Sequence, residues 1–159
     1  MLMKSLKELI NAILNSSENK ELENIKRNPT MIKEITNPTE AQQLAAVRSS
    51  SHVIKYIKEP TKKVRFIALK DDIYNYRYIK SLTKKEQLYL IKEGIRIENI
   101  KRPVEKVQLY ALKWRRASIN DIKNPTEKAQ LITIRKDKEL FLSLVSTKNF
   151  LVTSRLKIK

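Results

Sequence analysis

One motif recurs at intervals of 21 or 22 residues and constrains the fold more than any other feature of this chain. Its five clearest copies open with NPTEAQQLAAVR (37–48), EPTKKVRFIALK (59–70), SLTKKEQLYLIK (81–92), RPVEKVQLYALK (102–113) and NPTEKAQLITIR (124–135). Each copy closes with a shorter apolar segment, so the five cover residues 37–145. A degenerate sixth copy precedes them from residue 16. Self-similarity at this period indicates an array of stacked supersecondary units.

We number the positions of each repeat from the residue that is proline at 38, 60, 103 and 125 and leucine at 82. Apolar residues recur at positions 6 and 9, a three-residue step that places them on one face of a short helix. They are Leu44, Phe66, Leu88, Leu109 and Leu131 at position 6, and Val47, Leu69, Ile91, Leu112 and Ile134 at position 9. The closing segments show the same step, as in Tyr76 and Ile79. We therefore expect each repeat to contain a helix, a tight turn and a shorter helix.

The residues at the ends of the predicted helices agree with this pattern. In Asn37-Pro38-Thr39-Glu40 we expect Asn37 to be the N-cap and Pro38 to occupy the first helical position. At the inter-helix turn, Gly94 predicts a positive φ, and Asp71-Asp72 is expected to cap the second helix of its repeat.

One such unit cannot bury its apolar face alone, whereas stacked units form a continuous core. The sequence therefore predicts an all-α fold, a right-handed α-solenoid of about six 21–22-residue helix-turn-helix repeats in a single domain, 1–159. Residues 1–15 are amphipathic and predict an N-terminal capping helix, and 16–145 hold the repeats. Residues 146–159 are expected to form a C-terminal cap or a basic tail.

The repeated strings resemble short HEAT-like and leucine-rich-variant repeats. They are also similar to the two-helix NPTEKVQLAAVK-type repeats of uncharacterised bacterial and phage proteins. The resemblance covers about residues 16–145 and implies a helical solenoid. It implies no activity, because solenoids serve mostly as binding surfaces.

Composition excludes several classes of functional site. The chain has no cysteine, which excludes disulfides, thiolate metal sites and cysteine nucleophiles, and its one glycine excludes glycine-rich phosphate-binding loops. A single histidine, His52, leaves no His-rich metal site, and we expect it to be a cap or a surface residue. We expect no metal, no cofactor and no enzymatic activity. A distant alternative is a HEAT-like DNA glycosylase, for which Trp114 and Asp121 are the only matching pair.

The basic residues recur at fixed positions. The formal net charge is +17, from 34 basic and 17 acidic residues, which favours an anionic partner. Position 10 is basic throughout and holds Lys26, Arg48, Lys70, Lys92, Lys113 and Arg135. Position 3 adds Lys63, Lys85, Lys106 and Lys128, and the ends of the closing segments add Lys58, Lys80, Lys101 and Lys123. These rows predict a surface that follows a phosphate backbone.

A structural explanation of position 10 stays open, because a cation in the last turn of a helix also complements the helix dipole. That explanation does not extend to position 3, which falls in first turns, where the dipole disfavours a cation. Two further patterns are ambiguous. Glutamines at position 5 (Gln43, Gln87, Gln108 and Gln130) either read bases or, as we expect, face solvent. The cluster Trp114-Arg115-Arg116 suits base stacking or burial against the neighbouring repeat, and Tyr74 and Tyr78 are candidate surface aromatics.

Two hypotheses follow for the function. In the first, the basic face binds the backbone of DNA or RNA, or a nucleoprotein. In the second, the chain is a protein-interaction module that docks on an acidic partner, for example as a phage-encoded inhibitor of a host or defence machine of the anti-CRISPR type. No apolar run is long enough to span a membrane, and we expect a cytoplasmic location in a bacterium or infected host cell. The oligomeric state is open.

Overall fold

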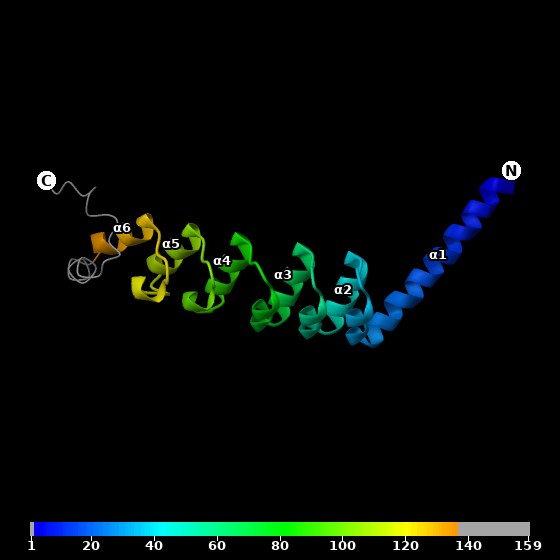
Figure 1. Cartoon of the computed structure of the whole chain (residues 1–159), viewed down its shortest axis with the longest axis horizontal. Helices are drawn as coiled ribbons and strands as arrows, with labels where there is room; N and C mark the ends of the chain where they lie inside the picture. The colour runs from blue at the N-terminus through cyan, green and yellow to red at the C-terminus, as the bar shows by residue number, and fades with distance from the viewer. Residues whose placement is uncertain (1, 137–159) are drawn as a thin grey trace. The chain divides into compact units, whose positions relative to one another are not determined.

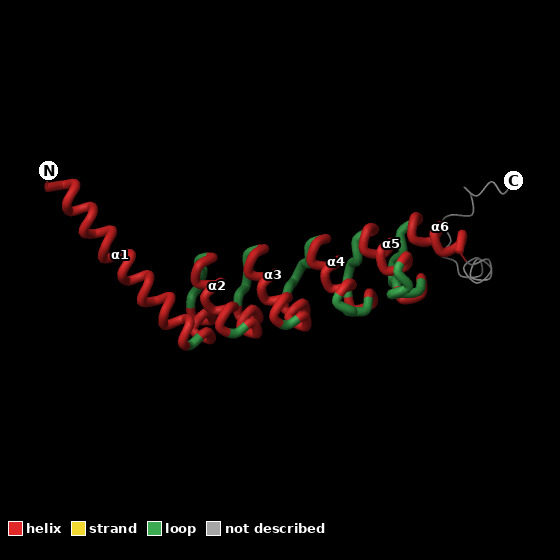
Figure 2. Tube along the Cα trace, turned by 180° about the vertical axis from the view of Figure 1, so that it is seen from behind, coloured by secondary structure: helices red, strands yellow, loops and turns green. Residues whose placement is uncertain are grey.

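The computed structural model describes residues 2–136, and every regular element among them is helical (Figures 1 and 2). Long and short helices alternate along the chain, which confirms the predicted all-α class. The α-helices are α1 (Leu2–Arg27), α2 (Glu40–Ser49), α3 (Lys62–Asp71), α4 (Lys84–Lys92), α5 (Glu105–Lys113) and α6 (Glu127–Lys136). The 3-10 helices are η1 (Pro29–Glu34), η2 (Ser51–Tyr56), η3 (Ile73–Tyr78), η4 (Ile97–Asn99) and η5 (Ile119–Asp121).

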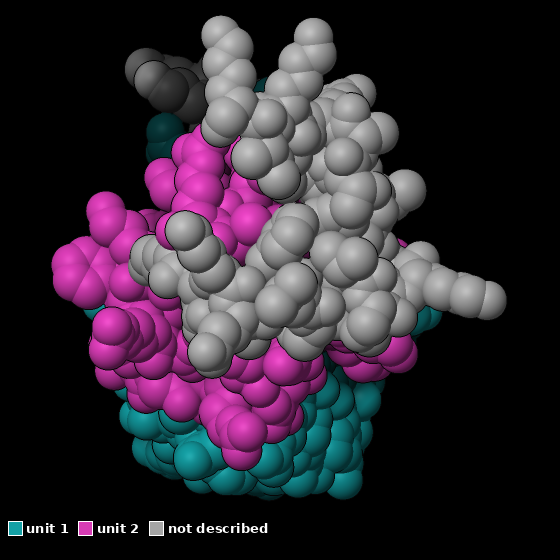
Figure 3. Space-filling view, turned by 90° about the vertical axis from the view of Figure 1, so that its left-hand side faces the viewer, with its two compact units in different colours: residues 1–81 teal, residues 82–159 magenta. Residues whose placement is uncertain are grey.

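The chain divides into two compact units, Met1–Ser81 and Leu82–Lys159 (Figure 3). In the first unit α1 packs on α2 and α2 on α3, while η1, η2 and η3 contact one another in the same order. In the second unit α4 packs on α5 and α5 on α6. Each unit is therefore a row of helices in which sequence neighbours are also neighbours in space. The predicted C-terminal segment, residues 146–159, lies outside the described residues, as does the closing segment of the last repeat.

Threonine at position 1 starts most of the repeat helices. Thr39, Thr61 and Thr83 are N-caps whose hydroxyl oxygens accept the backbone N–H three residues later, at 3.3, 3.4 and 3.4 Å. The prediction that Asn37 caps the helix and Pro38 begins it was therefore wrong by two residues, since α2 begins at Glu40. A threonine hydroxyl satisfies an orphan N–H of the first turn, and the proline lies just before the cap.

Wherever it is described, the second segment of a repeat is a 3-10 helix of three to six residues, where the sequence predicted a short α-helix. Two kinds of turn lead into it. Ser50 and Asp72 are extended, with φ of −156° and −136°, and Asp72 Oδ1 accepts the Tyr74 N–H at 2.9 Å, which confirms its capping role. At the same repeat position in the second unit, Gly94 and Arg115 are left-handed, with φ of +95° and +51°. The positive φ predicted for Gly94 is confirmed.

Of the two repeat positions that the sequence placed in the core, the structure buries only one fully. Position 9 is buried in the first four helices, α2 to α5, as predicted. Position 6 is only half-buried, and its place in the core is taken by position 8 (Ala46, Ala68, Leu90 and Ala111), with Val64, Val107 and Ala129 at position 4. Small residues at position 8 allow adjacent helices to approach closely, which turns position 6 toward the surface.

Glutamines at position 5 link consecutive repeats. Gln43, Gln87 and Gln108 are buried, so the expectation that they face solvent was wrong. Each Nε2 donates to the carbonyl at position 0 of its own repeat, at 2.9 to 3.1 Å. Each Oε1 accepts the N-cap N–H of the next repeat, from Thr61, Val104 and Thr126 respectively, at 2.8 to 3.1 Å. Glutamine suits this role because its side-chain amide carries both a donor NH₂ group and an acceptor oxygen.

Where the preceding repeat has no glutamine, the N-cap N–H finds its acceptor locally. Thr39 donates to Gln42 Oε1 at 2.8 Å, and Thr83 donates to Glu86 Oε2 at 2.6 Å. Position 5 before Thr83 is Arg65, a side chain with no acceptor, which donates to Ser81 O at 3.3 Å. Position 4 is therefore polar where the preceding repeat lacks a glutamine at position 5. Where the preceding repeat has that glutamine, position 4 is apolar.

The first helix is longer than predicted. α1 runs without a break through the expected capping segment and into the degenerate repeat, where Ile25 is fully buried. In its N-terminal half the apolar side chains Leu6, Leu9, Ile10, Ile13 and Leu14 are exposed. The capping role of residues 1–15 stays a prediction. Within the described residues, no helix is both long enough and apolar enough to cross a membrane.

Candidate functional site

Three positions of the repeat, 3, 6 and 10, form a stripe along each helix. Seven residues correspond to nearly two turns of an α-helix, so positions 3 and 10 point in almost the same direction, with position 6 between them. In α3 these residues are Lys63, Phe66 and Lys70. Lys70 Nζ lies 5.3 Å from the centre of the half-buried Phe66 ring. The two basic rows found in the sequence therefore belong to one face.

The same stripe recurs in the second unit. We use the name cationic stripe for Lys63, Phe66 and Lys70 in α3, Lys85, Leu88 and Lys92 in α4, Lys106, Leu109 and Lys113 in α5, and Lys128, Leu131 and Arg135 in α6. All the cations in it are exposed, and all the position-6 side chains are half-buried. Each helix thus presents an apolar patch flanked by a positive charge at both ends.

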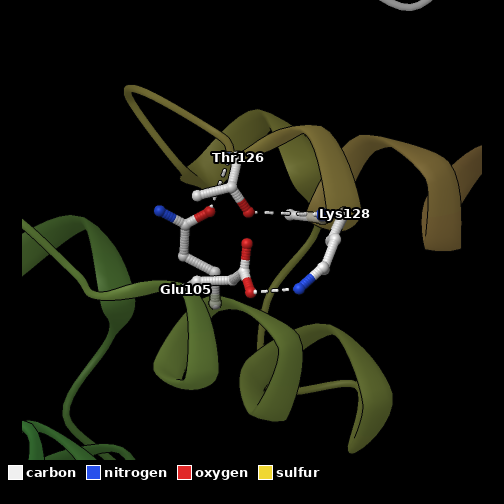
Figure 4. A network of polar contacts seen from close by, with 5 residues as sticks. Glu105, Thr126 and Lys128 are labelled. Atoms are coloured by element: carbon white, nitrogen blue, oxygen red, sulfur yellow. Dashed lines mark hydrogen bonds and ion pairs between the residues drawn. The ribbon is translucent and has the colours of Figure 1, made fainter.

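Within the second unit the stripes of successive helices face the same side. The glutamine links from Gln87 to Val104 and from Gln108 to Thr126 are the same contact repeated, so each helix has the same orientation relative to the one before it. Two contacts from a stripe cation to the neighbouring helix support this. Lys92 Nζ lies 5.7 Å from the centre of the Tyr110 ring, and Lys128 Nζ donates to Glu105 Oε1 at 3.0 Å (Figure 4).

In the first unit, residues at positions 6 and 10 of α1 and α2 line an open groove. α1 and α2 enclose about 390 Å³ between Leu22 and Lys26 on one side and Leu44 and Arg48 on the other. These are positions 6 and 10 of the degenerate repeat and of the first full repeat. Lys26 also donates to Glu23 Oε1 at 2.6 Å, and this hydrogen bond holds the pKa of the Glu23 carboxyl below its ordinary value. An apolar floor with cations on its rim suits an amphipathic anion.

Helix-dipole chemistry explains part of the stripe. The position-10 cations lie in the last turns of α1 to α5, where a cation complements the carbonyl end of the helix for about 0.3–1 kcal/mol. Lys63, Lys85 and Lys106 lie in first turns, at the end where the dipole disfavours them. No helix-capping role accounts for the first-turn lysines.

The loop after α5 presents the most exposed aromatic of the described repeats. Trp114 is 60 % exposed, so the alternative of burial against a neighbouring repeat is wrong. Its ring centre lies 6.1 Å from that of Tyr110, with the planes tilted by 42°, and Lys113 Nζ lies 5.8 Å from the indole. Arg115 and Arg116 are both exposed, and Arg116 also donates through Nη1 to Ile91 O at 3.2 Å.

The sequence analysis missed Tyr110. It lies four residues before Trp114, the separation at which helical side chains meet, and this spacing was the signal available in the sequence. Tyr74 and Tyr78 are exposed, as predicted, and Arg77 lies 5.3 Å from the Tyr74 ring centre. The predicted cations at positions 3 and 10 and at the ends of the closing segments are all described and exposed, as are Trp114, Arg115 and Arg116.

Residues considered for other chemistry have structural contacts. His52 is exposed, with Nε2 3.6 Å from Asp72 Oδ2. Asp121, the proposed partner of Trp114 in a glycosylase, accepts the Ser118 N–H at 2.7 Å in a capping box of η5. In the part of the chain that the structure describes, no group of His, Cys, Asp and Glu side chains is placed to hold a metal ion.

Comparison with known proteins adds no identity to this geometry. No protein family, curated protein or solved structure matches the chain.

Proposed function

We propose that this chain is a non-enzymatic nucleic-acid-binding protein whose cationic stripe binds the phosphate backbone of DNA or RNA. The observation that carries the proposal is that positions 3 and 10 share one exposed face of each helix from α3 to α6. Lysine and arginine on such a face neutralise phosphates and release counterions, which gives affinity without sequence preference.

We further propose that the repeats build a right-handed α-solenoid of about six units. The repeated glutamine link supports this, because the same donor and acceptor join one repeat to the next in both compact units. Helices in contact lie about 8–10 Å apart, so each added repeat extends the row of cations by that step. A row of this kind complements a linear polyanion.

The net charge supports an anionic partner independently of the stripe. The chain carries +17, whereas dipole-complementing cations at helix ends do not require such an excess. The first-turn lysines point the same way, because each costs stability at its own helix terminus.

A second candidate function is docking on an acidic protein, which includes a phage-encoded inhibitor of a host or defence machine. The half-buried apolar residues between the cations, Leu88, Leu109 and Leu131, favour it. Protein interfaces combine an apolar centre with a charged rim, whereas a phosphate backbone offers little for the leucines to contact.

The experiment measures fluorescence anisotropy of a labelled 20-nucleotide DNA, a matched RNA and a matched duplex at 50 mM salt. The triple variant Lys70→Gln, Lys92→Gln, Lys113→Gln is compared with Lys20→Gln, Lys33→Gln, Lys55→Gln, which removes the same charge from exposed lysines outside every predicted basic row. We expect the stripe variant to lose at least about tenfold in affinity and the control variant less than about threefold. Thermal unfolding of both variants controls for stability.

Absence of binding to all three nucleic acids, or equal losses in the two variants, would contradict the proposal. Poly-L-glutamate serves as the competitor that separates the two functions. If it displaces the nucleic acid at equal charge concentration, the stripe recognises an acidic chain as well as phosphate, and the protein-docking function is favoured. We expect it to compete at least tenfold less well.

A further inference from the structure

Trp114 lies exposed at the edge of the cationic stripe, on the same loop as two arginines. The Tyr110 ring supports the indole from one side, while Lys113 approaches it and Lys92 approaches Tyr110 from the neighbouring helix. Tryptophan is usually buried because it removes a large apolar area from water. An exposed tryptophan with this surrounding is a platform of aromatic surface bordered by positive charge.

The backbone next to Trp114 is strained. Arg115 has a φ of +51° at the repeat position where Gly94 has +95°. A left-handed conformation costs a residue with a Cβ about 1–2 kcal/mol, and glycine avoids that cost. The chain keeps an arginine there although glycine performs the same turn one repeat earlier. Strain of this kind is typical of positions where the side chain serves a ligand.

The loop is also held in place from below. Arg116 donates through its backbone N–H to Ala111 O at 2.8 Å and through its guanidinium to Ile91 O, at the end of α4. The platform is therefore fixed to two helices of the second unit. Because these bonds already fix the loop backbone, less ordering is needed when a ligand binds, which favours affinity.

We propose that the ligand is single-stranded nucleic acid and that one unpaired base stacks on Trp114 while Arg115, Lys113 and Lys92 bind the phosphates on either side. This inference rests on the proposed function and specifies its substrate. The base faces of a duplex are covered by neighbouring base pairs, so only an unpaired base offers a face to the indole. Stacking of this kind tolerates any sequence, as does phosphate binding.

Trp114 is the only tryptophan in the chain, so the intrinsic tryptophan emission reports on this site alone. The experiment titrates the full chain with oligo(dT) of 20 nucleotides and, separately, with a 20-base-pair duplex. We expect oligo(dT) to quench the emission strongly at saturation and the duplex to change it little. Binding is followed in parallel by anisotropy of the labelled nucleic acids.

Substitutions give a second measurement. Trp114→Ala is expected to lower oligo(dT) affinity about tenfold, and Trp114→Phe to retain most of it, because stacking needs an aromatic face. Tyr74→Ala removes another exposed aromatic, far from this loop in sequence, and is expected to change affinity less than twofold.

The outcomes separate the inference from the proposed function. If oligo(dT), the duplex and a matched RNA all fail to bind, the proposed function fails. If oligo(dT) binds through the stripe lysines while the emission stays constant and Trp114→Ala binds normally, the function stands and this inference is overturned. Equal quenching and affinity for duplex and single strand would also overturn it.

Discussion

Gln108 Oε1 accepts a hydrogen bond from the Thr126 backbone N–H at 2.8 Å, and this bond links α5 to the residue just before α6. The Gln108 amide also donates to Pro103 O and Asn124 O, at 2.9 and 3.2 Å, so one buried side chain pairs three backbone groups. Gln43 and Gln87 make equivalent bonds, so this link from glutamine to the next N-cap recurs between repeats.

Substitution Gln108→Leu is expected to lower the free energy of unfolding by about 1–3 kcal/mol, because it leaves buried backbone groups without partners. Gln130→Leu is the matched control. Gln130 Nε2 donates to Pro125 O, but its Oε1 has no partner among the described residues, so the loss should be smaller. Urea unfolding followed by circular dichroism measures both, and equal losses would show that the inter-repeat bond contributes nothing.

Val104 is the N-cap of α5 and makes no side-chain hydrogen bond there, whereas threonine occupies this position in the neighbouring repeats. Val104→Thr is expected to stabilise the chain by about 0.5–1 kcal/mol by supplying the missing cap. Thr61→Val, the converse change, should destabilise it by a similar amount, since the Thr61 hydroxyl caps α3. Thermal unfolding checks both, and a destabilised Val104→Thr variant would contradict the capping argument.

Arg115→Gly is expected to raise the free energy of unfolding by about 1 kcal/mol, since glycine relieves the left-handed strain. The same change is expected to weaken oligo(dT) binding severalfold, because it removes a cation beside Trp114. Gly94→Arg provides the reverse case: a Cβ at this position would meet no neighbour within 4 Å, so strain at φ +95° should be the main cost of the substitution. Unchanged stability of Arg115→Gly would contradict the strain at this position. Unchanged binding would contradict the role of the Arg115 cation in binding the ligand.

Glu105 pairs with Lys128 across two helices at the surface, with both side chains largely exposed. Exposed pairs of this kind contribute about 0–1 kcal/mol, so Glu105→Gln should change stability little. It should raise nucleic-acid affinity two- to threefold, because it removes a negative charge beside the stripe and ends the ion pair that holds Lys128. Glu98→Gln, which breaks the Arg96–Glu98 pair outside the stripe, is the control expected to have less effect. Lower affinity in Glu105→Gln would contradict the placement of the ligand on the stripe.

The sequence predicted the repeat, the helical class and the exposed cations because all three depend on periodicity alone. It placed position 6 in the core, because a three-residue step fits either of two adjacent helix faces. The small residues at position 8 distinguish these two faces only when the helices pack against one another. It also misplaced the glutamines, because burial of Gln43 depends on a backbone N–H of the next repeat, which no local pattern reveals.

Each repeat has either a glutamine at position 5 of the preceding repeat or a polar residue at its own position 4. This pattern is visible in the sequence, but only the hydrogen bonds of the structure explain it. Glu86 is polar at position 4 because Arg65 cannot accept a hydrogen bond, whereas Val107 is apolar because Gln87 can. The exposure of Trp114 likewise depends on the left-handed turn at Arg115, a conformation that sequence patterns do not assign to arginine.

The most direct test of the central claim is the salt dependence of oligo(dT) binding by the unaltered chain. If the stripe binds phosphates, the logarithm of the association constant falls linearly with the logarithm of salt concentration, with a slope of about −0.7 for each phosphate contacted. We expect a slope of about −3 or steeper, reduced by about two in the Lys70→Gln, Lys92→Gln, Lys113→Gln variant. A slope near zero, or one that the variant leaves unchanged, would contradict phosphate binding by the stripe.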